Sequence, residues 1–227
     1  MSNRDADSSA ASQPLRLPLG ACLAFSTEQP HYCLDPLEQR ALGNAGAKRT
    51  EQFRLGRAAA AAALAKLGAP AAPVGMLESG APQWPNNICG AISHTAALGV
   101  CVVGWATDFI ALGLDLHPLN RPITSTVAAR ICTHTEQREL QSAANPAWLA
   151  QAIFSAKETV FKALHPLYQQ FLGFKEAELT WLPEQQRFLA SVSKWGLQDL
   201  TITVDTTGDA LITLLALPRR QKVPHSQ

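Results

Sequence analysis

The sequence predicts an α+β protein made of two halves of similar size that meet near residue 112. Helical patterns and short apolar runs alternate along the chain in the order helix, strands, helices, strands. Its 227 residues amount to one or two domains at the typical length of about 150 residues per domain. We expect subdomains at 15–112 and 113–220, a disordered leader at 1–14 and a flexible tail at 221–227.

The first half is expected to contain one long helix between short strands. Residues 15–40 mix apolar residues with prolines, which favours a strand and then a turn near Asp35. Strong helix formers, including a run of six alanines, predict a helix from about 39 to 67, and Gly68 stands where a C-cap belongs. Residues 80–95 hold two prolines and two glycines and are expected to form a loop that leads into a brief strand. Two further strands should follow.

The second half is expected to contain two helices and then strands. The helices are predicted at about 124–144 and 148–164, the second ending before Pro166 because the residue before a proline avoids the helical region. After them the hydrophobic period changes to that of strands. The predicted strands are 178–182, 187–192, 200–204 and 211–217.

Composition excludes several classes of protein. With 47% hydrophobic and 16% charged residues, the chain is too apolar to be an extended disordered polyelectrolyte. A net charge of +1 supplies no global basic field for nucleic-acid binding, so we expect no nucleic-acid partner and only local anion sites. The longest apolar stretch is interrupted by Asp108 and Gly113, so no membrane span is expected.

The cysteines and the first residues indicate a reducing compartment. The five cysteines are far apart, odd in number and without a CxxC pair, which argues against a disulfide framework. The polar start of the chain carries acids where a signal peptide needs basic and then apolar residues. We therefore expect a cytoplasmic protein.

Asp115 is the first candidate for chemistry. The strand predicted at 110–117 alternates in polarity, which puts Asp115 and His117 on one face about 6.5 to 7 Å apart. An unpaired buried carboxylate is costly, so Asp115 should have a partner or a function. It caps a nearby loop or, together with an acid from a helix, binds Mg²⁺.

Further candidates lie on the helices and on the loop before the brief strand. Glu158 and Lys162 form an i, i+4 pair, which on an ordinary helix is a surface ion pair of about 0.3 to 0.5 kcal/mol. Ser93 and His94, in a glycine-flanked loop, suit either a phosphate or an ordinary core position. A hydrolase triad is disfavoured because the chain lacks a GxSxG elbow. The basic residues of the first long helix form a solvated face or hold a ligand: Lys48, Arg49, Arg54 and Arg57.

Taken together, two acids for a divalent cation and basic residues for phosphates suit transfer of a phosphate-containing group. Four segments in order resemble the signatures of the 4'-phosphopantetheinyl transferases of the surfactin- and enterobactin-synthetase type: KRTEQFRLGRAAAAAAL, GAPQWPNNICGAISHT, LGLDLH and FSAKETVFKAL. The resemblance implies a pseudo-dimer of two similar α/β subdomains with coenzyme A and Mg²⁺ in the cleft between them. It also implies transfer of the phosphopantetheine arm to a serine of an apo acyl or peptidyl carrier protein, with release of adenosine 3',5'-bisphosphate.

The resemblance also implies roles for individual residues. Asp115 and Glu158 match the metal-binding acids, and Glu136 falls where the family often has an acid proposed as general base. The residues expected to bind coenzyme A are Lys162 and its neighbour Lys157 at the pyrophosphate, Ser93 and His94 at a phosphate, and Arg49 and Arg57 at the nucleotide end.

His117 departs from the family pattern, which commonly has Asp-x-Glu on this strand. Imidazole is a poorer ligand than carboxylate for Mg²⁺. As a third metal ligand His117 would shift the preference toward Mn²⁺ or another softer cation; otherwise a water replaces the missing carboxylate, or the enzyme is slow. We expect the water-completed site.

Two other functions remain open at this point. A binding module for coenzyme A or a carrier protein that has lost catalysis through His117 would release no adenosine 3',5'-bisphosphate. A metal-dependent phosphate hydrolase would turn over without any carrier. The family type implies a monomer, and its subtype suggests siderophore or other secondary metabolism.

Overall fold

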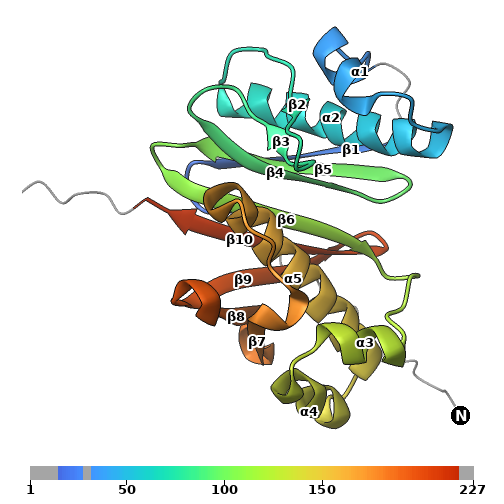
Figure 1. Cartoon of the computed structure of the whole chain (residues 1–227), viewed down its shortest axis with the longest axis vertical. Helices are drawn as coiled ribbons and strands as arrows, with labels where there is room; N and C mark the ends of the chain where they lie inside the picture. The colour runs from blue at the N-terminus through green and yellow to red at the C-terminus, as the bar shows by residue number, and fades with distance from the viewer. Residues whose placement is uncertain (1–14, 28–31, 220–227) are drawn as a thin grey trace, which may run out of the picture.

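The computed structural model describes residues 15–27 and 32–219 and consists of two stacked α/β units (Figure 1). The leader predicted at 1–14 and the tail predicted at 221–227 lie outside the described residues. No helix within the described ranges has the length and hydropathy needed to cross a membrane.

The first unit is a three-stranded antiparallel sheet in the order β1-β5-β4, covered on one face by the long helix α2. Its elements are β1 (Ala21–Thr27), α1 (Pro36–Leu42), α2 (Ala47–Leu67), β2 (Gly75–Met76), β3 (Pro82–Gln83), β4 (Ile88–His94) and β5 (Leu98–Trp105).

The second unit is a five-stranded antiparallel sheet in the order β6-β10-β9-β8-β7, covered by the long helix α5. Its elements are β6 (Phe109–Pro118), α3 (Ser125–Ile131), α4 (His134–Ser142), α5 (Pro146–Tyr168), β7 (Ala177–Leu182), β8 (Arg187–Val192), β9 (Leu197–Thr207) and β10 (Ala210–Pro218). Short 3-10 turns lie at Phe174–Glu176, Pro183–Gln185 and Ser193–Trp195.

The two units repeat one arrangement, which confirms the predicted pseudo-dimer. In each unit a strand leads to a long helix, and the last strand pairs between the other two: β1-β5-β4 in the first sheet and β6-β10-β9 in the second. Strands β7 and β8 extend only the second sheet. A tight turn at 106–108 joins β5 to β6, so the chain passes directly from one sheet to the other. The predicted boundary between 112 and 113 falls within β6, which belongs to the second sheet from Phe109 onward; the subdomain limits by residue number stay a prediction.

An apolar layer joins the two units. It contains Val100 and Val102 of β5, Leu114 and Leu116 of β6, and Ile212 of β10. The opposite face of each sheet packs against its own helix. Because β4 also lies beside β6, polar side chains at this edge can reach from one unit to the other.

Three predicted helix boundaries were wrong. Asp35 does not mark a turn: its side chain caps α1, which ends at Gly43, so the helix predicted at 39–67 is two helices. The helix predicted at 124–144 is also two, because Thr133 caps the start of α4. Helix α5 continues past Pro166 to Tyr168, although the proline removes one intrahelical hydrogen bond, and its C-cap Gln169 adopts the left-handed conformation.

Glycines allow the long helices to approach the sheets closely. A Cβ at Gly113 of β6 would lie 2.2 Å from the Thr159 carbonyl oxygen and 2.8 Å from Ala163 Cβ, both on α5. A Cβ at Gly99 of β5 would lie 2.3 Å from the Leu55 carbonyl oxygen on α2. The approach at Gly113 brings the polar face of α5 onto β6.

We expect Gly113→Ala to lower the free energy of unfolding by about 1 to 3 kcal/mol, because α5 must move away from the sheet to admit the methyl group. Urea denaturation measures this loss. The matched control is Gly173→Ala, because a Cβ at Gly173 would have its nearest neighbouring atoms at an ordinary contact distance of 3.5 Å or more. Equal stability of the two variants would show that the close approach at Gly113 is not required.

Candidate active site

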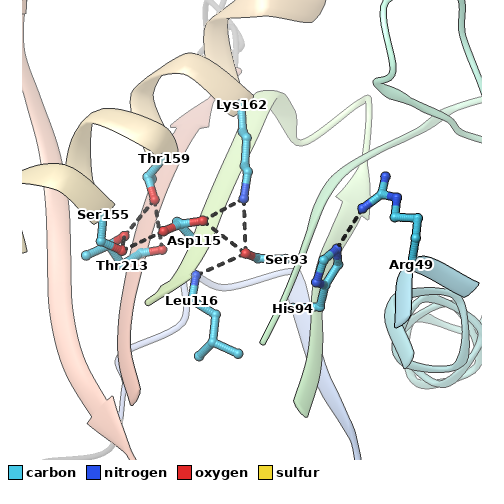
Figure 2. Close-up of polar contacts among 9 residues, drawn as sticks. All are labelled: Arg49, Ser93, His94, Asp115, Leu116, Ser155, Thr159, Lys162 and Thr213. Carbon is cyan, nitrogen blue, oxygen red and sulfur yellow. Dashed lines mark hydrogen bonds and ion pairs between the residues drawn. The ribbon is translucent and has the colours of Figure 1, made fainter. Parts of the chain in front are cut away.

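Asp115 lies at the centre of a polar cluster between α5, β10 and β4 (Figure 2). Its Oδ1 accepts hydrogen bonds from Lys162 Nζ at 2.6 Å and Ser93 Oγ at 3.0 Å, and its Oδ2 accepts one from Ser155 Oγ at 2.9 Å. The residue is only 6% exposed. The sequence expectation that this acid has a partner is confirmed.

These partners keep the Asp115 carboxyl group ionised. Burial raises its pKa, but the charge of Lys162 and the hydrogen bonds from Lys162, Ser155 and Ser93 outweigh burial and hold the pKa below its usual range. The site therefore contains a buried negative charge paired with one ammonium group.

Ser93 connects the two units. It stands on β4, donates to Asp115 Oδ1, and accepts from the Leu116 N–H of β6 at 3.1 Å and from Lys162 Nζ at 3.0 Å. A single hydroxyl group thus ties the edge of the first sheet to both the strand and the helix of the second.

Glu158 lies one turn before Lys162 on α5, but the predicted i, i+4 ion pair between them is absent because Lys162 pairs with Asp115. Within the described ranges, Glu158 has no hydrogen-bond or ion-pair partner. Burial raises its pKa, the Asp115 charge raises it further, and Lys162 opposes them. The carboxyl groups of Asp115 and Glu158 therefore lie near a single ammonium group, that of Lys162. The cluster can accept one further positive charge.

A cavity of about 390 Å³ opens beside this cluster, between the two units. Glu158 and Lys162 line it from α5, and Arg49 and His94 line it from the first unit. Arg49 Nη1 donates to His94 Nε2 at 3.3 Å (Figure 2). Burial and the positive charges of Arg49 and Lys162 lower the pKa of His94, so the ring is neutral near pH 7. The lining is mostly apolar, and Arg49 and Lys162 add positive charge to it, which suits a ligand with an apolar part and an anionic part.

Comparison with known proteins decides the family. One family model, the 4'-phosphopantetheinyl transferase N-terminal domain, matches residues 37–104, and a second, the 4'-phosphopantetheinyl transferase superfamily, matches 111–215. The chain is 35% identical over 167 residues to 4'-phosphopantetheinyl transferase Svp of Streptomyces mobaraensis, covering 72% of this chain and 67% of Svp. It is 31% identical over 192 residues to enterobactin synthase component D of Salmonella typhi, covering 82% of this chain and 79% of that protein. The chain belongs to the 4'-phosphopantetheinyl transferase superfamily.

The sequence prediction of a 4'-phosphopantetheinyl transferase is therefore confirmed. A solved structure, holo-acyl-carrier-protein synthase from Neisseria meningitidis, matches with a TM-score of 0.40 and 21% identity, covering 49% of this chain and 99% of that one. The two family models meet between residues 104 and 111, at the turn that joins β5 to β6.

The structure brings six of the predicted site residues of this transferase together. They are Asp115, Ser93 and Lys162 in the cluster, and Glu158, Arg49 and His94 around the cavity. Arg57 also lines the cavity but is only 5% exposed. Its Nη2 donates to the Gly75 carbonyl at 3.0 Å and its guanidinium lies over the Phe53 ring. Arg57 therefore anchors the β2–β3 segment that forms part of the cavity wall.

His117 does not join Asp115 and Glu158 in a metal site. Its Nε2 donates to the Arg121 carbonyl at 2.9 Å, and its ring contacts Phe154 edge-on. In the part of the chain that the structure describes, no three His, Cys, Asp or Glu side chains gather as a metal-binding group. His117 as a third ligand beside Asp115 and Glu158 does not fit this geometry because the three side chains do not gather, whereas the bond from Nε2 alone would leave Nδ1 free to bind a metal.

Glu136 and Lys157 do not reach the cavity either. Glu136 is fully buried and pairs with Lys157 at 2.7 Å. Glu136 also accepts from the backbone N–H groups of Thr133 and Leu179, while Lys157 donates to three carbonyls, of Ile131, Phe174 and Ala177. Neither the general-base role expected for Glu136 nor the coenzyme A contact expected for Lys157 agrees with these positions. The pair instead ties α4, α5 and β7 together.

Sequence reasoning missed three hydroxyl residues around Asp115, namely Ser155, Thr159 and Thr213. Thr213 faces Asp115 in the register of β10 with β6. The available signal was a single hydroxyl residue within the apolar run of that strand, LITLLAL.

We expect Glu136→Gln to lower the free energy of unfolding by about 3 to 5 kcal/mol, because it leaves the Lys157 ammonium buried without its counter-charge. The folded fraction, assayed at low temperature, should retain its kcat. Denaturation and initial-rate measurements on one preparation separate the two effects. If Glu136→Gln were as stable as the wild type but had no turnover, the result would support Glu136 as the general base.

Proposed function

We propose that this transferase moves the 4'-phosphopantetheine arm of coenzyme A to a serine hydroxyl of an apo carrier protein, releasing adenosine 3',5'-bisphosphate. The observation that supports this proposal best is the junction of Asp115, Ser93 and Lys162, from which Lys162 reaches the wall of a cavity lined by both units. It sets a paired carboxylate and an ammonium group beside space for an anionic ligand.

The anionic parts of coenzyme A would be held by the basic lining of the cavity. Lys162 would contact the pyrophosphate, where its charge stabilises the negative charge that develops as the phosphoanhydride bond breaks. Arg49 and His94, at the other side of the cavity, would hold the phosphates of the nucleotide end. Arg57 would act there through the wall segment that it anchors. Ser93 would act through Lys162, whose Nζ donates to it, because its own hydrogen is donated to Asp115.

Asp115 and Glu158 would hold Mg²⁺, and the residues present fit that ion. Both supply carboxylate oxygens, which Mg²⁺ prefers, and Glu158 has no partner of its own among the described side chains. Bound Mg²⁺ would neutralise the negative charge that develops on the 5'-phosphate of the leaving adenosine 3',5'-bisphosphate. With Nε2 of His117 engaged elsewhere, waters and substrate oxygens would complete the coordination, as is usual for Mg²⁺. Mn²⁺ offers the same octahedral coordination.

The acceptor would be an acyl or peptidyl carrier protein of secondary metabolism, such as siderophore synthesis. The similarity to enterobactin synthase component D supports this choice. All five cysteines are free thiols, which supports action in the cytoplasm. The cavity is formed within one chain, which supports a monomer as the active form.

Intact-mass spectrometry of apo carrier proteins tests the proposal. Incubation with coenzyme A and Mg²⁺ should add about 340 Da, the mass of one phosphopantetheine arm on serine. A carrier with its acceptor serine changed to alanine should gain no mass. With the unchanged carrier, the amount of adenosine 3',5'-bisphosphate released should equal the amount of carrier modified. Coenzyme A binding without mass gain on any carrier would indicate a binding module, and turnover without a carrier would indicate a hydrolase.

A metal titration tests the proposed ligands. We expect Glu158→Gln to raise the Mg²⁺ concentration for half-maximal rate by about tenfold or more, because an oxygen ligand loses its charge. His117→Ala should leave this concentration nearly unchanged, because the imidazole is held at Arg121. A larger increase with His117→Ala than with Glu158→Gln would instead support His117 as a metal ligand.

A further inference from the structure

Three hydroxyl groups in series lead to the second oxygen of Asp115 (Figure 2). Ser155 of α5 donates to Asp115 Oδ2 at 2.9 Å. Ser155 Oγ lies 2.9 Å from Thr213 Oγ1 of β10, and Thr213 Oγ1 lies 2.7 Å from Thr159 Oγ1 of α5. All three residues are fully buried, so bulk water does not compete for these hydrogen bonds.

The direction of donation along this series follows from counting hydrogens. A carboxylate only accepts, and a hydroxyl group has one hydrogen to donate. Ser155 uses its hydrogen on Asp115, so Thr213 must donate to Ser155. Thr213 then has none left for Thr159. The one hydrogen of Thr159 is shared between Thr213 Oγ1 at 2.7 Å and the Thr213 carbonyl oxygen at 3.2 Å. The donors directed toward the carboxylate are therefore Thr213, to Ser155, and Ser155, to Asp115.

This directed series has a consequence for the carboxylate. Hydroxyl groups that donate in one direction polarise one another, which strengthens the last hydrogen bond. Oδ2 is held from the α5 and β10 side, while Oδ1 contacts Lys162, which lines the cavity. We infer that Thr213 and Ser155 are positioning residues that hold Asp115 in the orientation in which it receives a divalent cation. This inference rests on the metal role proposed above for Asp115.

A neighbouring threonine provides the comparison with a purely structural hydroxyl. Thr203 of β9 donates to the Leu214 carbonyl at 3.4 Å and is not part of the series. If Thr213 served only to satisfy buried polar atoms, its loss would affect stability, as loss of the Thr203 hydroxyl does, and would leave cation binding unchanged.

The test measures binding of Mn²⁺ alone to the full chain by the loss of the free-ion paramagnetic resonance signal. Thr213→Val removes the hydroxyl at constant shape and should weaken Mn²⁺ binding by about tenfold. Thr213→Ser keeps the hydroxyl and should bind close to wild type, as should Thr203→Val. In the transfer reaction, Thr213→Val should raise the Mg²⁺ concentration for half-maximal rate and keep most of kcat at saturating Mg²⁺.

The Asp115→Asn variant in the same measurement distinguishes the metal role proposed for Asp115 from the positioning role inferred for Thr213 and Ser155. Equal Mn²⁺ binding by Asp115→Asn and the wild type, or none by either, would overturn the metal role and this inference with it. Weaker binding by Asp115→Asn but not by folded Thr213→Val would overturn the positioning role alone. The positioning role would also be overturned if Thr213→Ser and Thr213→Val weakened Mn²⁺ binding equally, because the packing of the side chain would then matter and its hydroxyl group would not. If Thr213→Val does not fold, Ser155→Ala carries the same comparison.

Discussion

The buried charge of Asp115 is the constraint on which the arrangement of the two units depends. A carboxylate at this depth is tolerated only with partners, and its three partners come from two places: Lys162 and Ser155 from α5, and Ser93 from the first unit. Satisfying this one group therefore fixes the position of α5 on β6 and that of β4 beside β6. The absence of a side chain at Gly113 makes the first of these contacts sterically feasible. The cavity beside the cluster is a result of the same geometry, because its walls belong to the elements that Asp115 holds together.

Much of the fold could be predicted because the hydrophobic period is strong where the elements are long. The alternation in β6 placed Asp115 and His117 on one face, and both do contact α5, at Ser155 and Phe154. The helix breaks were missed because they depend on single capping residues. Asp35 caps the start of α1 ahead of the predicted helix, and Gly43 ends α1 within it. Thr133 caps the start of α4 inside the second predicted helix, although Thr133-x-x-Glu136 is the spacing of a capping box.

The candidate site was predictable where spacing along one element sufficed, and not where several elements had to meet. Glu158 and Lys162 lie one turn apart on α5 and both line the cavity. His117 shares its face with Asp115 but lies beyond the cluster, where the Arg121 carbonyl occupies its Nε2. Glu136 and Lys157 were assigned by family position, whereas their pairing in the core depends on the path of the 3-10 turn Phe174–Glu176 and of β7, which carries no local signal. Thr213 became significant only once β10 was paired with β6.

The order of strands also decides which strand edges of the two sheets stay open. In the first sheet the edge strands are β1 and β4, and β4 lies beside β6 of the other unit. In the second sheet the counterpart of β4 is β9, whose outer edge is already paired with β8. An unpaired strand edge is a template for pairing with another chain. Strands β7 and β8 therefore move the open edge of the second sheet two strands away from the counterpart of β4, to β7.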